Sequence, residues 1–291
     1  MTLGVWDPLL IAVKTLTYAS TLGAAGAVFF LRYCGRLIAG VDGLRIRRLV
    51  LGLALLSAFA GAAQIMVTAG SMSGDASAML DGTLLRMVLQ AGAGRASTIR
   101  AIGLLLGALV VLSDRPPWLA LFGAAMAATS FAWTGHARSL HPDVLPILLL
   151  GVHLLGVAFW LGALAPLLII ARGGDLSRIA AAAERFGAAA VVVVGALMAA
   201  GLTLLWMLLG EFTALWGSAY GRSVILKLAF VACLLCLAAF NNLRLTPRLR
   251  SGDTRAAGSL RTSIRLELLL GIAILAITAA LTTLTGPPAL D

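Results

Sequence analysis

Hydrophobic residues along the chain gather into long runs, which short polar segments rich in arginine separate. A helix needs roughly 20 mostly apolar residues to cross a bilayer. The pattern predicts eight such spans, at about residues 9–31, 49–70, 96–113, 118–135, 144–171, 186–209, 223–243 and 264–285. The third is the weakest, because its apolar part from Ala101 to Leu112 is short and requires Arg100 to snorkel toward the headgroups. We therefore expect an all-α, polytopic membrane helix bundle with eight transmembrane helices.

The placement of the basic residues predicts how these spans are oriented. With eight spans, the loops after the first, third, fifth and seventh carry 15 of the 22 Lys and Arg residues, whereas the opposite loops carry five. Short loops rich in Lys and Arg stay on the cytoplasmic side. Deleting the third span would divide the arginine-rich loops between the two sides, which this rule disfavours. We therefore expect both termini outside and inner loops that contact anionic lipid.

Composition agrees with a membrane protein and excludes several other classes. The chain of 291 residues is 60% hydrophobic, with a mean hydropathy of +1.01, and only 12% charged. A net charge of +10 here reports orientation, since no basic tail or basic–aromatic interleaving indicates a nucleic-acid surface. Three cysteines exclude a disulfide framework. The N-terminus lacks the basic segment and cleavage site of a signal peptide, so the first apolar run is expected to be retained.

The chain is expected to form one transmembrane domain over residues 1–291. Its longest segment outside the spans, 71–95, begins with loop chemistry and then shows helical apolar spacing, so it predicts an outer loop with an interfacial helix. The segment 243–263 is expected to be a cytosolic loop that connects the last two spans.

The only three histidines, His136, His141 and His153, fall within one short stretch around the start of the fifth span. The topology places His136 and His141 at the outer face, and His153 about nine residues into the span, or ~13 Å at 1.5 Å per residue. An ionisable group inside a span indicates function by default. Alternatively, His141 is solvated surface, and His153 hydrogen-bonds a backbone carbonyl on a neighbouring helix.

Sulfur residues divide between the two sides in the same topology. Met66 and Met72 lie toward the outer side, while Cys233 and Cys236 share one face of the seventh span toward the inner side. Imidazole binds both Cu(I) and Cu(II), and thioether and thiolate favour Cu(I). The pattern therefore predicts a copper path with an outer site at His136, His153, His141, Met72 and Met66 and an inner resting point at Cys233 and Cys236. Packing is the alternative for each sulfur residue.

Three further charged residues lie inside predicted spans. Lys14 and Lys227 are in the outer half of the membrane, where they either snorkel to the headgroups or face the bundle to pair with an acid or a bound anion. Glu267 falls three residues into the last span, and a helix-start acid paired with Arg265 is the simplest interpretation.

Several stretches resemble the copper resistance protein D (CopD/PcoD) family, and the resemblance covers most of the chain and is clearest from about residue 130 to residue 285. The stretches are Gly135-His136, the run from His153 to Trp160-Leu-Gly162, the segment from Tyr220 to Lys227, and Asn241-Asn242. The resemblance implies an eight-helix inner-membrane protein that moves copper from the periplasm to the cytoplasm, often with a CopC-type periplasmic copper-binding partner. It also singles out His136, His153 and Lys227. The family pattern usually reads Trp-x-Gly-Gly, and in this chain Ala163 replaces the second glycine.

The leading hypothesis is a copper homeostasis membrane protein rather than an enzyme, since no hydrolase, kinase, P-loop or dinucleotide motif is present. Two alternatives stay open. A haem-binding redox protein would use two histidines as axial ligands, and a non-transporting copper sensor or scaffold would bind copper without moving it.

Overall fold

The computed structural model describes residues 4–38, 40–111, 117–133, 144–211 and 213–285, and the described part is helical with no strand. The longest helices are α1 (Asp7–Tyr33), α2 (Gly40–Ser73), α6 (Leu145–Ala171), α7 (Leu176–Leu209), α9 (Ala219–Phe240) and α11 (Thr254–Leu284). Two others, α4 (Gly92–Val111) and α5 (Pro117–Thr129), pack on each other, and a 3₁₀ turn, η3 (Ser130–Trp133), extends α5. Each predicted span therefore coincides with a helix of the described residues.

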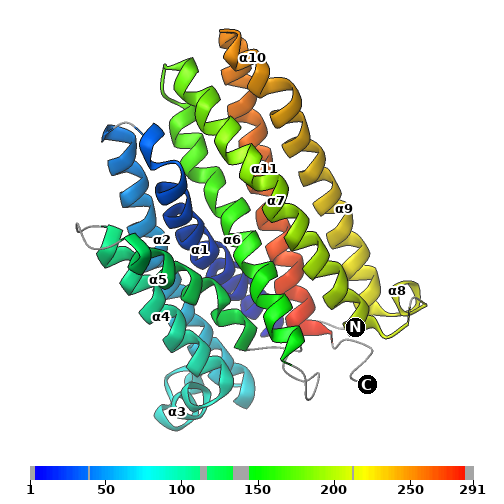
Figure 1. The fold of residues 1–291 in the computed structure, drawn as a ribbon. Coiled ribbons are helices and arrows are strands. Elements are labelled where there is room, and N and C mark those ends of the chain that lie inside the picture. The colour runs from blue at the N-terminus through cyan, green and yellow to red at the C-terminus, as the bar shows by residue number, and fades with distance from the viewer. Residues whose placement is uncertain (1–3, 39, 112–116, 134–143, 212, 286–291) are drawn as a thin grey trace.

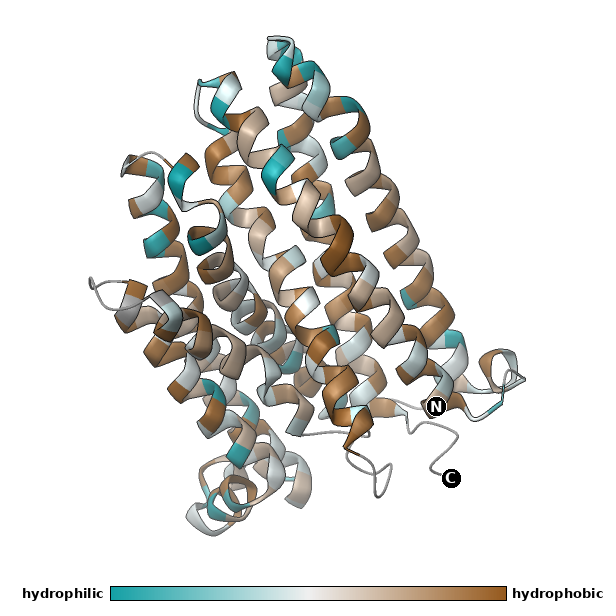
Figure 2. Ribbon diagram, in the orientation of Figure 1, coloured by the Kyte–Doolittle hydropathy of each residue, from teal (hydrophilic) through white to brown (hydrophobic). Residues whose placement is uncertain are grey.

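Six of these helices are long and apolar enough to cross a membrane: α1, α2, α6, α7, α11, and α9 together with its extension to Arg250. The apolar stretch Trp118–Trp133 is shorter. Hydrophobic residues occupy most of the middle of the long helices, and hydrophilic residues concentrate toward their ends (Figure 2). The described chain is thus a polytopic helical membrane bundle.

Helices α1 and α6 form the centre of the bundle. α1 contacts α2, α5, α6 and α11, and α6 also contacts α7 and α11. A Cβ atom at Gly26 would overlap the carbonyl oxygen of Ala158, and one at Gly162 would overlap the backbone of α1. Both glycines are therefore required for the two backbones to cross this closely, as is typical of membrane helix pairs. α4 and α5 lie against α1 on one flank, and α9 lies against α11 on the other (Figure 1).

Short helices cover the two ends of the bundle. η2 (Ala76–Leu80) and α3 (Gly82–Gln90) follow α2, and α8 (Ala214–Gly217) precedes α9. They lie at the end opposite to α10 (Thr246–Arg250) (Figure 1). Asp81, Asp175, Ser218 and Asp253 precede α3, α7, α9 and α11, and the side chain of each accepts a hydrogen bond from a backbone N–H of the helix that follows. Such caps explain where these helices begin.

The segment 243–263 is mostly helical, so its prediction as a loop is wrong. α9 continues through a π-helical segment, η5 (Asn241–Leu245), into α10, and α11 begins at Thr254 after a short turn. Hydropathy detects only the part of a helix that lies in lipid, whereas arginine-rich sequence is also a good helix former. For the same reason α2 and α7 begin nine and ten residues before the predicted spans.

Candidate metal-binding site

His153 lies on α6, two turns after its start at Leu145, and its side chain is half-buried in the bundle. Its Nδ1 is 3.2 Å from the carbonyl oxygen of Leu197 on α7. A carbonyl oxygen only accepts hydrogen bonds, so the contact requires the proton on Nδ1. The other ring nitrogen, Nε2, is then the one with a free lone pair. The carbonyl contact that the sequence offered as an alternative therefore exists, and it is compatible with metal binding at Nε2.

Small residues make room for the imidazole between α6 and α7. A Cβ atom at Gly201 would lie 3.0 Å from Nδ1 of His153, and one at Gly156 would lie 2.9 Å from Cβ of Leu197. A larger side chain at either position would push the ring or the two helices apart. Gly201 was not singled out from the sequence, because an isolated helical glycine carries no signal of what it faces.

Lys227 on α9 is the second polar group of this region. Its side chain is half-buried and lies within electrostatic range of the His153 ring. Within the described chain it has no ion pair and no hydrogen bond. The two residues are 74 positions apart in sequence, and the fold brings them within electrostatic range of each other. In the described chain Lys227 therefore pairs with no acid.

The other predicted outer ligands are not assembled around His153 in the described chain. His136 and His141 lie outside the described residues. Met72, in the last turn of α2, is 55% exposed, and Met66 is half-buried on the same helix. Among the described residues, no group of three or more His, Cys, Asp and Glu side chains could hold a metal ion. The full predicted ligand set accordingly stays a prediction.

Cys233 and Cys236 both lie on an exposed face of α9. Their spacing places them on the same side of the helix, as predicted, but this side is directed away from the bundle. Cys34, which follows α1, is fully buried instead. Metal binding at the Cys233–Cys236 pair stays a prediction, and the exposure of both thiols favours contact with lipid.

Lys14 holds the end of another helix. Its Nζ donates hydrogen bonds to the carbonyl oxygen of Thr282, at 3.2 Å, and to Oγ1 of Thr283, at 2.9 Å, both in the last turn of α11. A cation at a helix C-terminus satisfies unpaired carbonyl groups and opposes the helix dipole. Lys14 therefore neither pairs with an acid in the described chain nor depends on headgroups alone.

The predicted pairing of Glu267 with Arg265 is wrong. Glu267 lies 13 residues after the first residue of α11, so the helix start does not stabilise its charge, and Arg265 is exposed. Glu267 is 2% exposed and accepts a hydrogen bond from Nδ2 of Asn241. The error arose because hydropathy placed the helix start about ten residues too late.

The sequence predicted that Arg100 snorkels to the membrane surface, and the structure shows that it does not. Its side chain is 5% exposed, its Nε donates to Oγ of Ser130 at 3.3 Å, and its guanidinium lies 4.1 Å from the ring centroid of Phe131. The charge is therefore turned into the bundle, where a hydroxyl and an aromatic face stabilise it. No local pattern in the sequence distinguishes this inward rotamer from the outward one.

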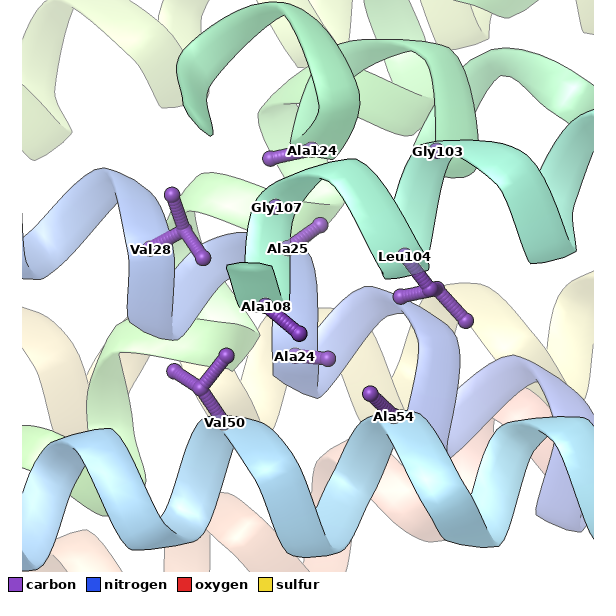
Figure 3. A pocket seen from close by; sticks show the side chains of 10 residues that line it. All are labelled: Ala24, Ala25, Val28, Val50, Ala54, Gly103, Leu104, Gly107, Ala108 and Ala124. Carbon is purple, nitrogen blue, oxygen red and sulfur yellow. The ribbon is translucent and has the colours of Figure 1, made fainter. Parts of the chain in front are cut away.

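A small apolar cavity between α1, α2, α4 and α5 provides no ion site. Its volume is about 10 Å³. Figure 3 shows alanine, valine, leucine and glycine residues around it, namely Ala24, Ala25, Val28, Val50, Ala54, Gly103, Leu104, Gly107, Ala108 and Ala124. A space of this size holds at most one water, and apolar walls leave it dry. It is a packing gap.

Comparison with known proteins decides the family. Residues 5–141 match the family described as copper resistance protein D-like, N-terminal domain, and residues 180–281 match copper resistance protein D. The chain is also 29% identical to the copper resistance protein D of Pseudomonas syringae pv. tomato, over 96% of this chain and 97% of that protein. The chain belongs to the copper resistance protein D family. His153 lies between the two family matches, within the region that the whole-length relative covers.

A second relative, described as a copper transport protein, is larger than this chain. The copper transport protein CutJ of Bacillus subtilis (strain 168) is 27% identical over 59% of this chain, and the match spans 31% of CutJ. The shared region is therefore a minor part of that protein. No solved structure matches the chain.

Proposed function

We propose that this chain is a copper homeostasis protein of the bacterial inner membrane that moves copper ions from the periplasm toward the cytoplasm through the bundle. The family membership and the names of its relatives support copper as the substrate. The observation that carries the site is the half-buried His153, whose Nδ1–H is held by the Leu197 carbonyl. An imidazole that donates one N–H to a carbonyl is the usual arrangement of a metal-ligating histidine.

The outer site would combine His153 with His136, and with His141, Met72 and Met66 as further ligands. Imidazole and thioether together suit copper in either oxidation state. Lys227 contributes a positive charge within range of His153, and this charge repels an arriving copper ion. Passage requires binding that is strong enough to admit an ion and weak enough to release it. Lys227 would therefore weaken copper binding enough for the ion to leave the site.

The proposal includes eight spans with both termini outside. The arginine distribution supports it, as does the helix found at each of the eight predicted positions. Six spans without α4 and α5 would orient the other helices identically, so the α4–α5 connection decides between the two topologies. With eight spans, a cysteine introduced by Asp114→Cys would be labelled only from the cytoplasmic side by a membrane-impermeant maleimide. Labelling from the periplasmic side would contradict the eight-span topology.

Copper uptake by the full chain in proteoliposomes tests the function. We expect uptake by the wild type and at least about tenfold slower uptake by His153→Ala, since one good ligand contributes a 1.4 kcal/mol interaction or more. Equal uptake by the two proteins would exclude a route through His153. No uptake by a wild type that binds copper would favour a sensor or scaffold, and a Soret band in the purified protein would favour haem.

Two matched variants separate ligation from packing at His153. His153→Asn keeps an N–H that can donate to the Leu197 carbonyl but replaces the metal-binding nitrogen. His153→Met supplies a thioether ligand for Cu(I) and loses that hydrogen bond. If His153 binds copper, the Met variant retains more uptake than the Asn variant. The reverse order would assign His153 a purely structural role.

A further inference from the structure

A second buried polar cluster lies between α11 and the π-helical segment that extends α9, apart from His153. Glu267 is 2% exposed, and its Oε1 accepts a hydrogen bond from Nδ2 of Asn241. Asn241 opens the π-helical segment η5, and Oγ1 of Thr246 donates to its backbone carbonyl at 2.9 Å. π-Helical insertions within α-helices are frequent at functional sites.

Two oxygen atoms in this cluster have no partner within the described chain. They are Oδ1 of Asn241 and Oγ of Ser263, and both are buried. Ser263 is 6% exposed and lies four residues before Glu267, on the same face of α11. A buried polar atom without a hydrogen bond costs roughly 1–3 kcal/mol. The cluster therefore contains an unpaired amide oxygen, which can only accept, and an unpaired hydroxyl.

Charged groups of α7, α10, α11 and η5 are engaged elsewhere or exposed. Arg185 of α7 donates to the carbonyl oxygen of Tyr33, and Arg261 of α11 donates to that of Ala171. Glu184 of α7 pairs with Arg250 of α10. The remaining cations near this level, Arg244 of η5 and Arg265 of α11, are exposed, and α6 brings no charged side chain. In the described chain, none of these groups forms an ion pair with Glu267.

These contacts distinguish the two forms of the carboxyl group. An ionised Glu267 would be a buried charge without a cation, and it could not supply a donor to the unpaired Oδ1 of Asn241. A protonated carboxyl has one O–H donor, and Oδ1 of Asn241, on the amide that already donates to Glu267, is an unpaired acceptor. A carboxylic acid and a carboxamide can then form two hydrogen bonds with each other. The added proton satisfies both groups.

We propose that Glu267 and Asn241 form a buried proton-binding site at the α10 end of the bundle. The site holds one proton on the Glu267 carboxyl, shared with the Asn241 amide. Deprotonation releases that proton to the adjacent aqueous side and leaves a carboxylate, and no electron is transferred. On the function proposed above, this carboxyl exchanges its proton as copper passes.

Infrared spectroscopy of the full chain in lipid nanodiscs tests the site without any transport assay. A protonated carboxylic acid gives a carbonyl stretch that is separate from the amide bands and shifts in heavy water. We expect this band in the wild type near neutral pH, its loss in Glu267→Gln, and its retention in the control Glu184→Gln. Asn241→Leu should keep the band and shift it toward that of an unbonded acid. Identical spectra for the wild type and Glu267→Gln would overturn the proposal, including the case in which a water or a metal ion occupies the cluster.

Copper uptake under an imposed pH gradient tests the coupling. If one proton is exchanged per copper ion, each pH unit changes the equilibrium copper ratio across the membrane about tenfold. Glu267→Gln should lose this dependence while still equilibrating copper. A wild type that transports copper equally at every gradient would refute the coupling. A wild type that transports no copper would refute the proposed function instead, and the infrared band would still decide whether Glu267 holds a proton.

Discussion

Two of the ionisable groups that the bundle buries lie in contrasting surroundings, Arg100 on one flank and Glu267 on the other. Arg100 contacts a hydroxyl and an aromatic face. Glu267 has a single amide donor and lies in a cluster with two unpaired oxygen atoms. Both are removed from water, yet one has groups that stabilise its charge and the other does not. Burial alone therefore does not distinguish a structural charge from an exchangeable one, whereas the balance of donors and acceptors does.

The largest effect is expected from Arg100→Ala. The change removes the cation–π contact and the hydrogen bond to Ser130 and opens a cavity, which should cost about 2–4 kcal/mol. Thermal unfolding in detergent measures the loss as a lower Tm. Arg95→Ala is the matched control, because Arg95 is exposed on the same helix and should leave Tm unchanged. Equal effects of the two variants would contradict a structural role for Arg100.

Phe131→Leu should produce an intermediate effect. Leucine keeps most of the apolar volume but removes the aromatic face beneath the guanidinium, so we expect a loss of about 1–2 kcal/mol. Phe122→Leu, at a residue of α5 that is 58% exposed, provides the control. A double-mutant cycle with Arg100→Ala isolates the contact. Strictly additive effects would show that Arg100 and Phe131 do not interact.

A small effect is expected from Glu267→Gln, in contrast to Arg100→Ala. The glutamine amide is neutral, and its oxygen can accept a hydrogen bond from Asn241 as the acid does. The free energy of unfolding should therefore change by less than about 1 kcal/mol, with a correspondingly small shift in Tm. Differential scanning fluorimetry near neutral pH measures it. A loss as large as that of Arg100→Ala would mean that Glu267 carries a charge with a stabilising partner, and the comparison between the two residues would fail.

The smallest effect is expected from a partly exposed acid, Asp253, which caps α11. Hydrogen bonds from the Arg248 side chain and from the backbone N–H of Arg255 lower the pKa of its carboxyl. A depressed pKa stabilises the fold above the unfolded value of about 4 and loses this contribution as the pH falls through the folded value. Tm measured between about pH 6 and pH 3 should therefore fall less in Asp253→Asn than in the wild type. Parallel curves would contradict this prediction.

The sequence predicted the positions of the helices, because membrane thickness sets the length of each apolar run. It mispredicted the contacts of individual polar side chains. Each predicted span coincides with a helix, and six of these helices are long and apolar enough to cross a membrane, since apolar length follows from membrane thickness. The inward rotamer of Arg100 and the separation of Glu267 from Arg265 were both mispredicted. Neither choice leaves a local trace, because a guanidinium or a carboxyl can turn either way from the same backbone position. The placement of Cys233 and Cys236 on one face of a helix followed from their spacing, whereas the direction of that face did not.

The sequence by itself determined that this chain is a polytopic helical membrane protein, and the residues it shares with the copper resistance protein D family were recognisable from sequence. Only the tertiary structure decided that the ring of His153 meets the carbonyl of Leu197 and lies near Lys227, and that Glu267 meets Asn241. The physical reason is that helices such as α6 are apolar all round, so their sequence has no stripe that shows which face turns inward. Close packing at small residues makes that choice, and it brings together groups that lie far apart in the chain.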